Sequence, residues 1–265
     1  AELVRLYDFL LKAIEEGRAI YDNLRKFITY IFASNMPEVN PFMAMSLLKI
    51  PLALTVPQIL AIDLGTDLLP ALGLGVERPE PNVMQRPPRN RNKPLLDRSL
   101  FMRAFMFLGL LQTALCYIGF FYVFFARGIN PLQIDRVDWL PYSDRLLTVQ
   151  GRAYVLATTV FHAGVIMAQI GNAYACRTER GHVRYLGWVR NRSLTAGVLA
   201  SVGIILTLIY FQPLAYLFEL LPLPIQYWAG LALFAPIMYI ADWFRRFILN
   251  WIEWSRRKRQ AEEKS

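Results

Sequence analysis

The chain has 265 residues, of which 55% are hydrophobic and only 18% are charged, and its mean hydropathy is +0.30. A soluble domain of this size carries more charge, and the apolar residues here fall into blocks of about 17–25, the length that spans a bilayer. This composition excludes an ordinary soluble protein and predicts an all-α, polytopic membrane bundle. The formal charge of +9 has two explanations, a nucleic-acid partner or the cytoplasmic bias of Lys and Arg in membrane proteins.

The chain opens on a charged, amphipathic segment over residues 1–26, which we expect to form a helix outside the hydrocarbon. Six apolar segments follow, and each is expected to cross the membrane once: 27–48, 58–74, 99–126, 153–175, 193–211 and 225–244. A Pro- and Arg-rich polar loop over 75–98 separates the first two spans from the other four, which lie within 99–248. A basic tail over 249–265 ends the chain.

Six spans place both termini on the same side of the membrane. All but five of the 29 Lys and Arg residues fall on that side, the exceptions being Lys49, Arg127, Arg136, Arg145 and Arg152. This asymmetry predicts that both termini are cytoplasmic, and it accounts for the positive charge without a nucleic-acid partner. Position 1 is Ala and no targeting signal follows, so we expect a chain trimmed at its front and a prokaryotic plasma membrane as its location.

Polar side chains lie inside the first two spans, where lipid makes them costly. They are Ser34, Asn35 and Glu38 in the first span and Asp63, Thr66 and Asp67 in the second. An ionisable group at mid-membrane costs about 2.5–3.5 kcal/mol, so three carboxylates need compensation, and a bound cation would supply it. Asp63, Thr66 and Asp67 are spaced i, i+3 and i+4, which on a helix places all three on one face.

The backbone around these residues is also suited to ion binding. Pro37 removes an amide donor in the first span, while Gly65 and Pro70 weaken the second span near its carboxylates. Broken membrane helices expose carbonyl oxygens to cations, and such oxygen ligands suit Na⁺, K⁺, Ca²⁺ or H⁺ rather than Cu or Zn. The alternative is that the polar groups only join helices by hydrogen bonds, which stays open for Ser34 and Thr66 taken singly.

Several stretches closely resemble P-type ATPases of the calcium-pump and sodium-pump group, namely EEGRAIYDNLRKFITY, SNMPE, IDLGTDLLPALGLGVE and PEPNVMQRPPR. The similarity is dense over residues 12–98 and rests on span count and topology beyond them. The resemblance implies that the six spans are the family's fifth to tenth membrane helices. It also implies that 1–26 is a cytoplasmic stalk helix, 27–74 the ion-binding helix pair and 75–98 a cytoplasmic docking loop.

The resemblance implies a set of ion ligands: Asn35, Glu38, Asp63, Thr66 and Asp67, of which the carboxylates Glu38, Asp63 and Asp67 would bind a metal ion. It further implies secondary neighbours of the site: Tyr30, Ser34, Gln169 and Asn172. Asp63 is similar to the sodium and proton pumps, since calcium pumps have Asn there. Asn172 replaces an acidic residue of the sodium pump, so the transported ion stays open among Na⁺, K⁺, Ca²⁺ and H⁺.

The chain has no DKTGT phosphorylation motif, no TGE motif and no nucleotide-binding domain. The resemblance therefore implies that no catalytic residue lies here and that Mg²⁺ and ATP bind only in other domains of the pump. The expected partners are the lipid bilayer and the N-terminal part of the same pump, with its cytoplasmic domains and first four membrane helices. Alternatives are a non-catalytic membrane subunit and a passive cation-binding membrane protein. A secondary transporter is a third alternative, but the sequence has no inverted repeat, which argues against it.

Overall fold

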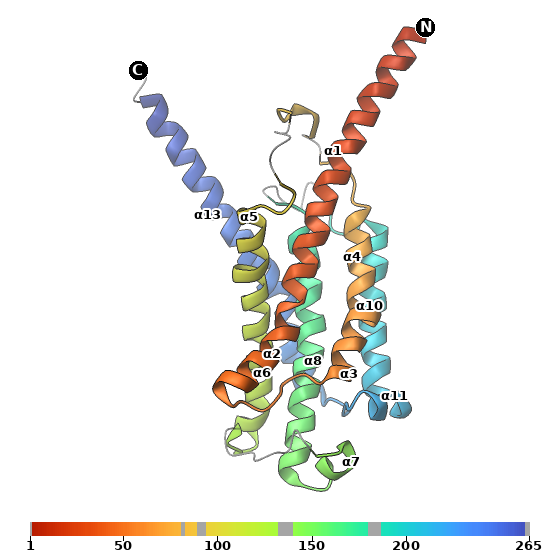
Figure 1. Ribbon diagram of the computed structural model, residues 1–265, viewed down its shortest axis with the longest axis vertical. Helices are drawn as coiled ribbons and strands as arrows, with labels where there is room; N and C mark the ends of the chain where they lie inside the picture. The colour runs from red at the N-terminus through yellow and green to blue at the C-terminus, as the bar shows by residue number, and fades with distance from the viewer. Residues whose placement is uncertain (1, 81–82, 89–93, 132–139, 180–186, 263–265) are drawn as a thin grey trace.

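Figure 1 shows the computed structural model as an elongated bundle of helices, with α1 and α13 extending beyond the bundle at the same end. The structure describes residues 2–80, 83–88, 94–131, 140–179 and 187–262. All regular structure in these ranges is helical, without a strand, so the prediction of an all-α chain is confirmed. Predictions outside them concern parts of the loop at 75–98 and the charges of Arg89, Arg91, Lys93, Arg136, Arg180, Arg184 and Lys264.

The longer helices fill the bundle, and the short ones lie at its ends or interrupt its spans. In chain order they are α1 (Glu2–Ser34), α2 (Met36–Leu48), α3 (Val56–Ala61), η1 (Ile62–Asp67), α4 (Leu68–Gly75), η2 (Val83–Gln85), α5 (Arg98–Phe101), η3 (Met102–Gly109), α6 (Leu110–Ala126), α7 (Tyr142–Arg145), α8 (Val149–Cys176), α10 (Arg192–Tyr210), α11 (Gln212–Leu217), α12 (Ile225–Leu231) and α13 (Phe234–Glu262). Of these, η1 and η3 are π-helical and η2 is a 3₁₀ turn.

Three described helical segments are long and apolar enough to cross a membrane: Arg98–Ala126, Val149–Cys176 and Arg192–Tyr210. They coincide with the third, fourth and fifth predicted spans. The other three predicted spans are not among these segments: the first breaks near Asn35, the sixth is divided between α12 and α13, and the second, like the third, contains a π-helical segment. The total of six spans stays a prediction, as does the side of the membrane on which the termini lie.

Two predicted segment boundaries, at 26/27 and 248/249, fall inside continuous helices. The stalk segment at 1–26 and the first span share one continuous helix, because α1 runs from Glu2 to Ser34. At the other end, α13 continues through the basic tail as far as Glu262. Both spans therefore extend as rigid helices well beyond their apolar parts.

Helix α8 lies at the centre of the bundle and is buried along most of its length. It packs against α6, α13, α1 and α10. Small residues permit the closest of these approaches, since Gly171 faces the backbone of Ala235 and Gly164 faces the ring of Phe234.

Glycines also bring α4 and α10 into close contact. A Cβ atom on Gly73 would lie 2.6 Å from the Cα of Leu194, and one on Gly197 would lie 2.8 Å from the carbonyl carbon of Leu69. Neither position has room for a side chain. The two helices are therefore held at a backbone separation that only glycine allows.

A buried ion pair joins four helices at the end of the bundle where the termini lie. Arg177 donates to both carboxylate oxygens of Glu77, at 2.7 and 3.0 Å. Asn191 donates to the same carboxylate at 3.0 Å and to the carbonyl of Gly73 at 2.8 Å, while Asn23 donates to the carbonyl of Glu77 at 2.6 Å. Burial raises the pKa of Glu77, but its bonds from Arg177 and Asn191 outweigh burial and lower that pKa below its ordinary value.

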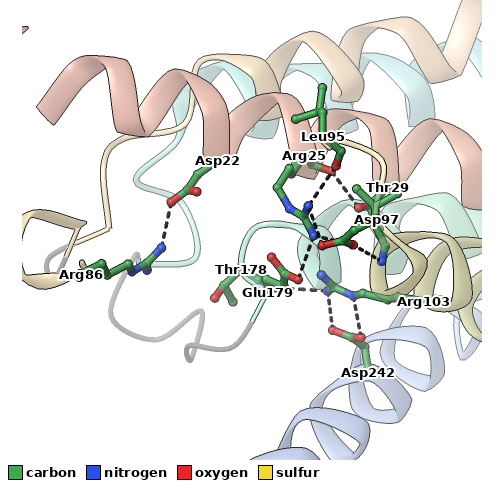
Figure 2. Close-up of polar contacts among 11 residues, drawn as sticks. Asp22, Arg25, Thr29, Arg86, Leu95, Asp97, Arg103, Thr178, Glu179 and Asp242 are labelled. Atoms are coloured by element: carbon green, nitrogen blue, oxygen red, sulfur yellow. Dashed lines mark hydrogen bonds and ion pairs between the residues drawn. The ribbon is translucent and has the colours of Figure 1, made fainter. Parts of the chain in front are cut away.

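Figure 2 shows a second charged network, which contains Arg25 and Arg103. Arg25 of α1 contacts Asp97 and Glu179, each at 3.2 Å, and Asp97 also caps α5. Arg103 contacts Asp242 of α13 at 2.9 Å and donates to the carbonyl of Ala175 at 2.9 Å. These contacts tie α1, α5, η3, α8 and α13 together at one level of the bundle.

The contact between α4 and α10 predicts unequal effects for two glycines of the same helix. We expect Gly197→Ala to destabilise the protein by about 1–3 kcal/mol, because the new methyl group meets the backbone of α4. Gly203→Ala is the matched control, since a Cβ there has no atom within 4 Å. Thermal unfolding in detergent measures both, and equal melting temperatures for the two variants would contradict the close packing.

The ion pair of Glu77 predicts a pH dependence. Because its pKa is lower in the folded protein than the ordinary 4.5, the pair stabilises the fold fully above pH 4.5, and that stability is lost as the pH falls below it. Glu77→Gln leaves Arg177 charged and buried, so we expect a loss of about 3–5 kcal/mol at pH 7. Glu80→Gln, which breaks a half-exposed pair with Arg86, should cost under about 1 kcal/mol. Unfolding curves recorded between pH 3.5 and 7 test this ordering.

Candidate cation-binding site

The predicted site residues lie on four neighbouring elements of the bundle. The inner part of α1 and the start of α2 carry Tyr30, Ser34, Asn35 and Glu38; η1 carries Asp63, Thr66 and Asp67; and α8 carries Gln169 and Asn172. Helix α8 contacts both α1 and η1. The structure therefore gathers the predicted residues into one region.

The first span breaks beside Glu38, where the sequence predicts a break. The last backbone hydrogen bond of α1 runs from the amide of Asn35 to the carbonyl of Ile31, at 3.1 Å. The amides of Glu38 and Val39 then both bond to the carbonyl of Asn35, at 3.2 and 3.1 Å. Pro37 occupies the first turn of α2, where its missing amide proton costs nothing. The break sets Glu38 in the first turn of a new helix, where its side chain is buried.

The second span widens into a π-helical turn at its carboxylates. Pro70 has no amide proton to offer the carbonyl of Thr66 four residues earlier. The hydroxyl of Ser201 on α10 lies 2.7 Å from that carbonyl and donates to it, while the carbonyl of Gly197 in its own helix lies at 2.9 Å as a second acceptor. Thr66 and Asp67 are buried, at 1% and 3% exposed, whereas Asp63 is exposed. The three residues therefore differ in environment despite their regular spacing.

A short hydrogen bond connects the two broken spans. The hydroxyl of Ser34 lies 2.6 Å from one carboxylate oxygen of Asp67, and both residues are buried. Tyr30 lies close enough to Asp67 to interact with it, although its hydroxyl does not reach hydrogen-bond geometry. Glu38 lies within electrostatic range of Asp63 and Asp67. Side chains of α1, α2 and η1 thus converge on Asp67.

Several buried oxygens in this cluster lack partners. Within the part of the chain that the structure describes, no hydrogen bond reaches Oδ1 of Asp67, Oε1 of Glu38 or the hydroxyl of Tyr30. A buried polar atom left unpaired costs about 1–3 kcal/mol, and more when it is charged. These oxygens are hard ligands of the kind that alkali and alkaline-earth cations prefer.

The two predicted residues of α8 differ in whether their side-chain amides are hydrogen-bonded. The side-chain amide of Asn172 donates to the carbonyl of Tyr30 at 3.3 Å and accepts from the thiol of Cys176 at 3.4 Å. Asn172 therefore holds α8 against α1. Gln169 is buried with neither side-chain polar atom bonded among the described residues, so it has both available to a ligand.

No three Asp, Glu, His or Cys side chains converge as a preformed metal site in the described ranges. The metal set of Glu38, Asp63 and Asp67 stays a prediction, because Asp63 is exposed at the surface of this chain. Sequence reasoning missed Ser201. The missing amide proton of Pro70 signalled that Thr66 needs another donor, but it did not indicate which neighbouring span supplies it.

Comparisons with known proteins found a matching family model and several relatives. Residues 51–248 match the model of the family described as "Cation transporting ATPase, C-terminus". The chain is 31% identical over 265 residues to the sodium/potassium-transporting ATPase subunit alpha-2 of Homo sapiens, covering 92% of this chain and 26% of the relative. It is 30% identical over 263 residues to the subunit alpha-4 of Rattus norvegicus, covering 92% and 25%. The chain thus spans about a quarter of the length of these relatives.

The contact of Ser201 with Thr66 predicts a specific loss of stability. We expect Ser201→Ala to cost about 1–3 kcal/mol, because the carbonyl of Thr66 then stays buried without a donor. Thr207→Ala on the same helix is the control, since its exposed hydroxyl bonds only within α10, and it should cost under about 0.5 kcal/mol. Both are measured by thermal unfolding in detergent, and a Ser201 variant as stable as the control would refute the role given to this hydroxyl.

Proposed function

The chain belongs to the cation-transporting ATPase family, as its C-terminal region, and from this membership we propose that it forms the ion-binding membrane part of an ATP-driven P-type cation pump. The observation that carries the proposal is the cluster around Asp67, a buried carboxylate with one unpartnered oxygen between two broken helices. Intramembrane carboxylates beside broken helices are typical of ion pathways.

We propose that Glu38, Asp63 and Asp67 bind the transported ion, with Asn35 and Thr66 completing the shell. Tyr30, Ser34, Gln169 and Asn172 then form its surroundings. The unpartnered oxygens of Glu38 and Asp67 support the first assignment, and the unpaired amide of Gln169 supports the second. The hydroxyl of Ser34 occupies one oxygen of Asp67 and leaves the other for a cation.

The exposure of Asp63 fits a site completed by another part of the same pump. Asp63 shares an exposed face of the second span with Leu60 and Leu64, which are 52% and 75% exposed. We propose that the first four membrane helices cover this face and bring Asp63 into the site. The cytoplasmic domains of the pump then supply the phosphorylated Asp, and Mg²⁺ and ATP bind there.

We propose Na⁺ or K⁺ as the first candidates for the ion, because the relatives reported above are named sodium/potassium-transporting. Ca²⁺ and H⁺ are the other candidates, since the same oxygen ligands serve them. A prokaryotic host stays a prediction from the sequence, and these relatives come from animals.

The membrane placement proposed here has six spans and two cytoplasmic ends. The strong bias of Lys and Arg supports it, as does the position of the described ends at one end of the bundle. The stalk at 1–26, the helix pair at 27–74, the loop at 75–98, the four spans within 99–248 and the tail at 249–265 are the proposed divisions. In this arrangement α1 carries Tyr30 and Ser34 on the helix that leaves the membrane, so movement of the stalk reaches the ion site directly.

Asp67→Asn in the full-length protein tests the proposal. ATPase activity is titrated separately with Na⁺, K⁺ and Ca²⁺, and we expect one of them to stimulate it. The variant should need at least about tenfold more of that ion, because replacing the carboxylate by a neutral amide removes several kcal/mol of electrostatic attraction for the ion. Asp144→Asn, an exposed carboxylate at the far end of the bundle, is the control and should behave as the unmodified protein.

Two results would count against the proposal. Equal ion dependence of the Asp67 variant and the unmodified pump would remove Asp67 from the site. No stimulation by any of the three ions in a folded protein would leave a proton pump or a non-catalytic membrane subunit as the better interpretation.

A further inference from the structure

An open cavity of about 610 Å³ lies where α4 ends and α10 begins, at the same end of the bundle as the termini. Three arginines line it, Arg78 just after α4 and Arg190 and Arg192 at the start of α10. None of the lining residues that the structure describes is acidic. We call it the arginine pocket, defined by Arg78, Arg190 and Arg192.

These arginines differ from others at this end of the bundle. Arg25, Arg86, Arg103 and Arg177 all form ion pairs with carboxylates. Among the described residues no ion pair reaches any of the three arginines of the pocket, and all three are exposed. The nearest carboxylate in sequence, that of Glu77, is buried and bonded to Arg177. The pocket therefore concentrates positive charge without a counter-charge from the described part of the chain.

Apolar side chains accompany this charge. Val76 and Val189 line the pocket and are 65% and 68% exposed. Leu72, one turn deeper on α4, and Leu199, two turns deeper on α10, are 54% and 66% exposed. A soluble anion makes no contact with these apolar side chains, whereas a phospholipid presents a phosphate together with acyl chains that can pack against them.

We propose that the arginine pocket binds the headgroup of an anionic phospholipid. Guanidinium groups bind phosphate oxygens in pairs, and basic pockets between membrane helices on the cytoplasmic side hold anionic headgroups. The inference rests on the proposed function only in its membrane placement, which puts this end of the bundle at the cytoplasmic leaflet. The acyl chains then lie along the exposed apolar faces of α4 and α10.

The position of the pocket gives the lipid a structural role. It touches the ends of the two helices that are joined deeper in the bundle by Ser201 and the carbonyl of Thr66. A headgroup bound to Arg78 and Arg192 links α4 to α10. It therefore supports the second span, in which Asp67 ends η1 just before α4.

Native mass spectrometry of the full-length protein tests the pocket. The detergent-purified protein is mixed with phosphatidylserine or with phosphatidylcholine of the same chain length, and retained lipid is counted. The variant with Arg78→Gln, Arg190→Gln and Arg192→Gln should hold phosphatidylserine on the order of 100-fold more weakly, from about fivefold for each basic residue. Arg192→Gln alone should weaken it about fivefold, which keeps the test sharp if the triple variant folds poorly.

The matched control removes three charges from the exposed tail, as Arg256→Gln, Lys258→Gln and Arg259→Gln, and should leave phosphatidylserine binding within about twofold of the unmodified protein. An equal loss in this control would show diffuse attraction and overturn the pocket. Displacement of the lipid by equimolar glycerophosphoserine or inorganic phosphate would identify a site for soluble anions and overturn the lipid assignment. Asp67→Asn should keep the lipid, so failure of the ion site and failure of the pocket are read separately.

Discussion

The hydroxyl of Ser201 supplies a donor that the second span lacks, because Pro70 leaves the carbonyl of Thr66 without its helical partner. Lipid offers no water to replace that donor, so a π-helical turn at Asp63, Thr66 and Asp67 requires a neighbouring helix. Gly73 and Gly197 let α10 come close enough to serve. The irregular backbone at the candidate site therefore depends on the packing of α4 against α10.

Buried charge is arranged differently at the two levels of the bundle. At the end where the termini lie, Glu77 and Asp242 are each matched by arginine, and these pairs fix the helices relative to one another. Deeper in the bundle, Glu38 and Asp67 have no basic partner among the described residues. Protein charges complete the first level, whereas the second has unpaired acceptor oxygens, where we propose that a cation binds.

Much of this could be predicted from the sequence, because length, apolar runs and proline act locally. Three spans and the break beside Pro37 follow from such local patterns. The exposure of Asp63 could not be predicted, since it depends on a π-helical turn and on which elements cover that face. Arg103 was missed as a partner of Asp242 because 139 residues separate them, and spacing carries no signal at that range.

Helix α1 is unbroken from Glu2 to Ser34, and its middle part is fastened to the polar end of the bundle. Arg18, Asn23 and Arg25 fasten the helix to Val83, Glu77 and Asp97. At 1.5 Å per residue, the outer arm Glu2–Gly17 is about 24 Å long and the inner arm Lys26–Ser34 about 13 Å. Because α1 is one continuous helix from Glu2 to Ser34, a displacement of its outer end is carried along the same helix towards Ser34, and the fastened stretch between the two arms decides how much of it arrives.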